Sequence, residues 1–170
     1  MIHLTPPSAP HVIRLRGPWD IRPLARTTLQ DDGTTTTEPG SLPLATQTEV
    51  PADWSVSLGE DFRGQVRYTR RFGRPSNLLA SEKISLVIEQ VDWIGEATLN
   101  GQILGQLKCG DPPACFEITS LLEFRNELVI DIALPRSTPQ TAYHLDRGNR
   151  DGMPGGLVGE VRLEIYSVDR

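Results

Sequence analysis

The chain has 170 residues, of which 15 are glycine and 14 are proline, and a formal net charge of −5 at pH 7. This length fits one domain, residues 1–170, because domains typically span about 100 to 200 residues. Frequent glycine and proline favour short strands over long helices. The negative charge offers no general attraction to nucleic acid or anionic membranes, so we expect neither as a partner.

Export and membrane insertion are not expected from the sequence. No stretch approaches the roughly eighteen apolar residues of a spanning helix. The first ten residues hold three prolines where a signal peptide needs an apolar run. The location is therefore unknown, with the cytoplasm as the default expectation.

The first distinctive segment, residues 26–50, is polar. It carries the run Thr34–Thr37 beside aspartate, glycine and proline residues. This composition predicts a long loop or a loose hairpin that projects from a core of about residues 12–168.

Residues 66–72 place Tyr68 and Phe72 on one face and Arg67, Thr69 and Arg71 on the other, which predicts a strand. Arg70 breaks the alternation. It marks either a bulge or a snorkelling position on an edge strand, or else a buried, paired and functional arginine.

Three later segments repeat the period of two. Ile84–Ile88, Leu128–Leu134 and Val161–Tyr166 place apolar side chains at alternate positions and predict half-buried strands. Convincing helical periodicity is absent from the sequence beyond one or two turns. The pattern as a whole predicts an all-β sandwich.

Asn100 and Gly101 join two apolar-patterned segments, Ala97–Leu99 and Ile103–Leu104. An Asn-Gly pair adopts the positive φ angles of a type I′ hairpin turn. We therefore predict a hairpin here, with Asn100 in a structural rather than a ligand-binding role.

Cys109 and Cys115 are the only cysteines, and the five residues between them could form a turn that brings the sulfurs together. A disulfide and two free thiols both remain open. Two cysteines without a nearby histidine do not make a zinc site, so no metal is expected.

Thr119–Phe124 could form one short helical turn with Thr119 as its N-cap. A second polar stretch, residues 136–156, follows the predicted strand that ends at Leu134. Long loops between strands are where binding sites concentrate.

Seven segments, taken together and in order, resemble the sugar-binding domain of glycoside hydrolase family 2, a jelly-roll of the galactose-binding-like type. The most specific match is Ala97–Gly105, which resembles the family's hairpin motif A-x-V-x-x-N-G-x-x-x-G. The family's tryptophan in G-x-x-W-Y-R-R-x-F is Val66 here, its acidic residue before I-T is Glu117, and the threonine-rich segment has no counterpart. The other matching segments are Gly17–Asp20, Val50–Trp54, Gly64–Phe72, Phe116–Leu122, Asn126–Val129 and Gly155–Glu164.

The resemblance implies a stand-alone, non-catalytic domain, because the family's catalytic carboxylates lie on a separate barrel. The acidic residues of the sequence also argue against a glycosidase, which needs two carboxylates that face each other. Only Asp146 and Asp151 share a loop, and a solvated loop explains them. We expect neither an enzyme nor a cofactor, and no calcium cluster can be assembled from the sequence.

Sugar binding needs an aromatic platform and planar hydrogen-bonding groups on a concave surface. Trp19 and Trp93 are expected in the core. The candidate platforms and hydrogen-bonding groups are Trp54, Asp53, Tyr143, His144, Arg147 and Asn149, and we favour Tyr143 with His144 because both lie in the polar segment. The expected partner is thus a mono- or oligosaccharide. The alternative is a structural β-sandwich that has lost sugar binding and docks a partner protein.

Overall fold

A computed structural model of the chain describes residues 9–168, and it is nearly all β. The expected all-β jelly-roll sandwich is confirmed. Four short helical turns interrupt the strands: α1 (Ser55–Leu58), η1 (Thr119–Leu121), η2 (Ala142–His144) and η3 (Gly148–Arg150). The strands are β1 (His11–Arg14), β2 (Trp19–Leu29), β3 (Thr35–Glu38), β4 (Thr46–Thr48), β5 (Ala52–Asp53), β6 (Gly64–Gly73), β7 (Glu82–Ile88), β8 (Ile94–Leu99), β9 (Gln102–Lys108), β10 (Ala114–Glu117), β11 (Arg125–Leu134), β12 (Gly156–Leu157) and β13 (Val161–Ser167).

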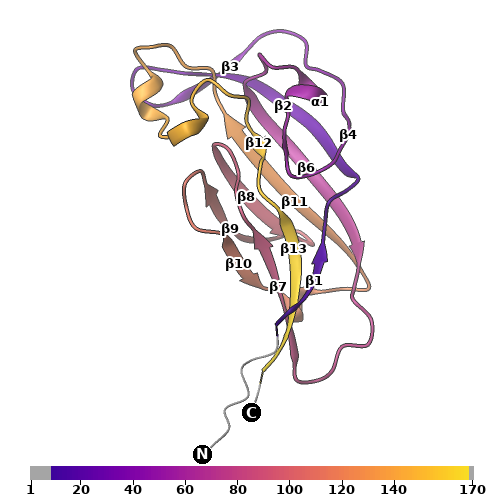
Figure 1. Cartoon of the computed structure of the whole chain (residues 1–170). Coiled ribbons are helices and arrows are strands. Elements are labelled where there is room, and N and C mark those ends of the chain that lie inside the picture. The colour runs from indigo at the N-terminus through magenta and orange to yellow at the C-terminus, as the bar shows by residue number, and fades with distance from the viewer. Residues whose placement is uncertain (1–8, 169–170) are drawn as a thin grey trace, which may run out of the picture.

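Two antiparallel sheets form the sandwich (Figure 1). The smaller sheet has the order β1-β13-β7-β10. The larger has the order β3-β2-β6-β11-β8-β9, with β4 also paired to β2. Strands distant in sequence are neighbours in both sheets, so residues from most of the chain meet in one core.

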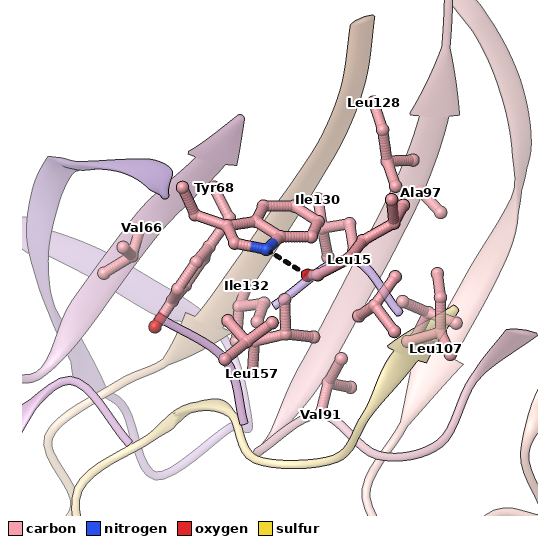
Figure 2. Packing of buried hydrophobic residues seen from close by; sticks show 14 of the residues in the cluster. Leu15, Val66, Tyr68, Val91, Ala97, Leu107, Leu128, Ile130, Ile132 and Leu157 are labelled. Atoms are coloured by element: carbon pink, nitrogen blue, oxygen red, sulfur yellow. Dashed lines mark hydrogen bonds between the residues drawn. The ribbon is translucent and has the colours of Figure 1, made fainter. Parts of the chain in front are cut away.

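The core fills the space between the sheets. Along β11 and β13 every second residue is buried, which confirms the period of two read from the sequence. Trp19 is fully buried, as expected, and its indole nitrogen donates a 2.7 Å hydrogen bond to the Leu15 carbonyl (Figure 2). The pairing satisfies the only polar atom of this side chain.

Strand β7 departs from the half-buried strand that we predicted, because Ile84–Ile88 is buried on both faces. Ser85 and Val87 point away from the core. Their register neighbours on β13 and β10 include Glu164 and Arg162, which are long and are hydrogen-bonded to each other at 2.8 Å. These side chains cover the two smaller ones, an effect of cross-strand neighbours that the local sequence does not show.

Arg70 lies neither on an edge strand nor at a bulge, since β6 lies between β11 and β2 and its one register shift against β2 is opposite Gln65 and Val66. Both structural predictions for this position are therefore wrong in detail. The side chain is half-buried on the core-facing side, and its Nη1 donates a 2.8 Å hydrogen bond to the Pro18 carbonyl. The guanidinium thus reaches out of the sandwich and joins β6 to the start of β2.

Strand β6 begins at Gly64, where β2 carries a register shift between Pro23 and Ala25. A Cβ atom on Gly64 would lie 1.9 Å from the Ala25 carbonyl oxygen. Only glycine permits this close approach of two backbones.

The predicted hairpin at Asn100-Gly101 is confirmed, with φ angles of 50° and 80°. The Asn100 amide nitrogen donates 3.0 Å hydrogen bonds to the Leu121 carbonyl and to Asn126 Oδ1. Its oxygen accepts one of 2.9 Å from the Glu127 amide. Asn100 therefore has the structural role that the turn chemistry indicated.

A short helical turn does form at η1, but the prediction that Thr119 caps it is wrong. The Thr119 hydroxyl accepts a 2.8 Å hydrogen bond from the Ile84 amide, across to β7. The N-cap residue is Ile118, which makes no side-chain cap hydrogen bond, and the Glu117 carboxylate accepts a 2.8 Å bond from the Thr119 amide.

The threonine-rich segment forms a hairpin of β2 with β3, and the chain then returns through β4. Cys109 is buried and Cys115 is exposed, and both are free thiols. None of the helices within residues 9–168 is long and apolar enough to cross a membrane.

Candidate functional site

The polar segment 136–156 folds over one end of the sandwich and includes η2 and η3 (Figure 1). Its anchor is Asp92, a carboxylate with no exposed surface, which lies just before β8. Arg147 donates to both Asp92 oxygens, at 2.8 and 2.6 Å, and Arg150 adds a third bond of 2.5 Å. Two arginines of the segment are thus tied to one buried carboxylate.

The same arginines fix the end of the segment. Arg147 also donates to the Met153 carbonyl at 2.6 Å, and Arg150 donates to the Pro154 carbonyl at 2.7 Å. Asp92 and Gly156 exchange backbone hydrogen bonds of 2.9 and 2.8 Å. These contacts hold the segment in one conformation although it has little regular structure.

Tyr143 and His144 lie at the surface of this segment. Their ring centroids are 4.0 Å apart and the ring planes are tilted by 33°. Tyr143 is 74% exposed, and His144 Nε2 lies 3.1 Å from the Asp31 carbonyl oxygen in the β2–β3 turn. The hairpin that the threonine-rich segment forms therefore supports the aromatic pair from the side.

Residues that come after the aromatic pair in sequence line a polar hollow of about 300 Å³. Asp146, Arg147 and Asn149 line it from the segment 136–156, and Gln90 and Lys108 line it from the sandwich. Amide, carboxylate and ammonium groups can all hydrogen-bond sugar hydroxyls. Of the predicted site residues, Arg147 and Asn149 line this hollow, whereas Trp54, Tyr143 and His144 do not.

Four of the six predicted site residues lie in the segment 136–156 as two separate pairs: the rings of Tyr143 and His144 pack against each other, and Arg147 and Asn149 line the hollow. The prediction for Trp54 as an exposed platform is wrong. Trp54 has no exposed surface, packs edge-on against Phe62, and lies beneath the segment, where its amide donates to the Gly155 carbonyl.

Asp53 belongs to the small β5–β12 sheet and is engaged locally. Its Oδ1 accepts hydrogen bonds from the Ser55 amide at 2.9 Å and from the Ser55 hydroxyl at 2.5 Å. Arg147 is also largely withdrawn from ligand contact, because its guanidinium is bound to Asp92 and its side chain is only 5% exposed. Both side chains position the backbone around the site.

Asp92, the residue that organises the site, is not predicted from the sequence. An aspartate between a valine and a tryptophan matches no binding motif, and its partners lie 55 and 58 positions further along the chain. The available signal was its place in an apolar stretch, since a carboxylate is rarely fully buried without a cationic partner.

The two acidic residues that share the segment, Asp146 and Asp151, are both exposed. Across residues 9–168 we find no group of three or more histidine, cysteine, aspartate or glutamate side chains that could hold a metal ion.

No family model and no curated protein matches the sequence. Solved structures with similar folds do exist. A β-glucuronidase from Bifidobacterium dentium complexed with coumarin-3-O-glucuronide matches with a TM-score of 0.66 and 22% identity, over 99% of this chain and 32% of its own. A β-glucuronidase from Faecalibacterium prausnitzii matches with a TM-score of 0.65 and 20% identity, over 98% of this chain and 33% of its own.

A GH2 β-galacturonidase from Eisenbergiella tayi, bound to glycerol, also matches, with a TM-score of 0.61 and 20% identity. The match covers 96% of this chain and 26% of that one. The chain therefore spans a third or less of the length of these enzymes. At such identities the likeness shows the fold, which is that of a β domain found within GH2 proteins.

Proposed function

We propose that this chain is a non-catalytic carbohydrate-binding accessory domain, equivalent to the sugar-binding domain of glycoside hydrolase family 2. The observation that carries the proposal is the Tyr143–His144 pair, whose tilted rings lie 4.0 Å apart at the surface of the segment 136–156. Later residues of the same segment, Asp146 and Asn149, line a polar hollow. The C–H groups on one face of a sugar ring pack against such an aromatic face. Asp146 and Asn149, which line the polar hollow, can hydrogen-bond the hydroxyl groups of a sugar.

The likeness in fold agrees with an accessory role, because the chain corresponds to a small part of each glycosidase. The enzymes named above act on glucuronides and galacturonides, so acidic sugars belong in any ligand panel. The exposed rings and solvated polar groups favour modest affinity, since few atoms lose contact with water on binding.

The test is calorimetry and thermal-shift measurement of the purified protein against galactosides, glucuronides, mannosides and oligosaccharides of xylan and pectin. We expect saturable binding to one class of sugar. Tyr143→Ala should weaken it about tenfold, the loss of roughly 1 kcal/mol or slightly more for one aromatic contact. Phe124→Ala is the matched control, because Phe124 is also an exposed aromatic residue, at 84%. It lies just before the start of β11, whereas the segment 136–156 follows the end of that strand.

The second candidate function is protein docking, and the surroundings of Phe124 favour it. A shallow groove of about 920 Å³ runs from the end of β6 to the start of β11, with Phe124, Phe72 and Arg74 in its lining. An exposed aromatic residue over an open groove is typical of interaction surfaces. If the protein is shown to be folded and binds none of the sugars in the panel, that result would favour protein docking over sugar binding.

A further inference from the structure

Three arginines converge on a hollow of about 210 Å³ at the end of the sandwich that carries the segment 136–156. Arg63 comes from the loop before β6, Arg136 follows β11, and Arg147 lies between η2 and η3. Among residues 9–168, Asp61 is the only acidic residue in the lining. This concentration of positive charge is unusual in a chain whose formal net charge is −5.

The position of Arg63 is fixed by backbone groups. Its Nη1 donates to the carbonyls of Glu60 and Phe62, both at 2.8 Å, and its Nη2 donates to the Gly152 carbonyl at 3.3 Å. Neutral carbonyls orient the guanidinium and do not cancel its charge. Within residues 9–168 no carboxylate forms an ion pair with Arg63 at 4.0 Å or less.

Arg136 is held by both its backbone and its side chain. Its amide donates to the Thr27 carbonyl at 2.8 Å, and its Nη2 donates to the Asp61 carbonyl at 3.3 Å. The nearest carboxylate, that of Glu38, is 3.6 Å from Nε. Part of the Arg136 guanidinium therefore stays available on the hollow.

The charges around the hollow do not balance. Arg63, Arg136 and Arg147 line the hollow, and Asp61 is the one described acidic residue beside them. Asp92 pairs with Arg147 and Glu38 lies 3.6 Å from Arg136, which leaves Arg63 without a carboxylate partner among residues 9–168. Burial, with the nearby charges of Arg147 and Arg136, lowers the pKa of the Arg63 guanidinium from its ordinary value. An anion in the hollow would relieve this repulsion.

We propose that this hollow binds the carboxylate of an acidic sugar unit. The inference rests on the proposed sugar-binding function and adds to it a second hollow, which shares Arg147 with the hollow that Asn149 lines. Guanidinium groups bind carboxylates through paired, charge-assisted hydrogen bonds. The hollow is smaller than the roughly 300 to 1,000 Å³ of typical ligand pockets, so it takes one uronate unit. Fixed donors make the site specific, because little reorganisation accompanies binding.

The test is calorimetric titration of the full chain with glucuronate and galacturonate, with glucose and galactose as neutral counterparts, and with acetate and inorganic phosphate as plain oxyanions. We expect a uronate to bind at least tenfold more tightly than its neutral counterpart. Its affinity should fall as salt rises, because added ions screen the attraction.

Two variants locate the site. Arg63→Gln should weaken uronate binding tenfold or more. The control is Arg16→Gln, which removes the same charge from an exposed position just after β1 and should leave uronate binding unchanged. Ser137→Glu adds a carboxylate to the lining without removing an arginine, and it should give the same loss even if Arg63→Gln fails to fold.

The outcomes separate the two proposals. Equal affinity for uronates and neutral sugars overturns the acidic-sugar inference and leaves sugar binding in place. Binding of acetate or phosphate as tight as that of a uronate also overturns it, since the sugar then contributes nothing. If no sugar of either kind binds, both proposals fail together.

Discussion

Arg147 donates two hydrogen bonds to Asp92, at 2.8 and 2.6 Å, across 55 positions of sequence, and neither side chain is more than 5% exposed. The pair joins the core of the sandwich to the segment that carries the candidate site. A buried ion pair adds little net stability, yet breaking it leaves an uncompensated charge in the interior.

Asp92→Asn should therefore destabilise the protein strongly. The substitution leaves the guanidinium groups of Arg147 and Arg150 without a counter-charge, at a cost of roughly 3 to 5 kcal/mol in the free energy of unfolding. Urea denaturation followed by fluorescence measures this quantity. We also expect binding to the candidate site to be lost, because the segment 136–156 loses its anchor.

The matched control is Asp131→Asn. Asp131 pairs with Arg67 in similar two-point geometry, at 2.8 and 2.7 Å, but both side chains are about half exposed to water. Exposed pairs contribute roughly 0 to 1 kcal/mol. Equal losses of stability in the two variants would contradict the role given to Asp92.

Asn100 supplies the second prediction, because its side chain and its backbone contribute separately. Asn100→Gly keeps the positive φ but removes three hydrogen bonds to Leu121, Asn126 and Glu127, which should cost about 1 to 3 kcal/mol. Asn100→Ala adds a left-handed strain of roughly 1 to 2 kcal/mol. Thermal unfolding should rank wild type above glycine and glycine above alanine, and a glycine variant as stable as wild type would disprove the bridging role of the side chain.

Local patterns predicted much of this fold. The strands β11 and β13 and the Asn100 hairpin follow from alternation and turn chemistry, which act between near neighbours in sequence. Two positions show where such patterns fail. The burial of Val87 depends on Arg162, which lies on a neighbouring strand, and the course of Arg70 depends on the Pro18 carbonyl.

The site was less predictable, because aromatic residues carry the same signal in a core as on a surface. Trp54 and Tyr143 both stand in segments without periodicity, yet one is buried under Gly155 and the other is exposed. Trp54 is buried by contacts with Phe62 and Gly155, which no local pattern relates to it. The basic hollow likewise gathers Arg63 and Arg136 from separate loops.

The two cysteines should differ in reactivity. Burial, with the nearby charge of Asp92, raises the pKa of the Cys109 thiol, so less of the reactive thiolate is present at pH 8. Cys115 is exposed on β10. We expect iodoacetamide to modify Cys115 at least tenfold faster, as followed by mass spectrometry. The control is the urea-unfolded chain, where the rates should converge, and equal rates in the folded protein would contradict the burial of Cys109.

Trp54 and Tyr143 give the last prediction, which separates loss of fold from loss of binding. Trp54→Ala empties a fully buried site that packs on Phe62 and should cost about 3 to 5 kcal/mol of stability. Tyr143→Ala removes an exposed ring and should change stability by no more than about 0.5 kcal/mol. Calorimetric unfolding of both variants, alongside the sugar titrations, checks the pair. A stable Tyr143→Ala protein that no longer binds would place the sugar on the aromatic pair, whereas unchanged binding would remove Tyr143 from the site.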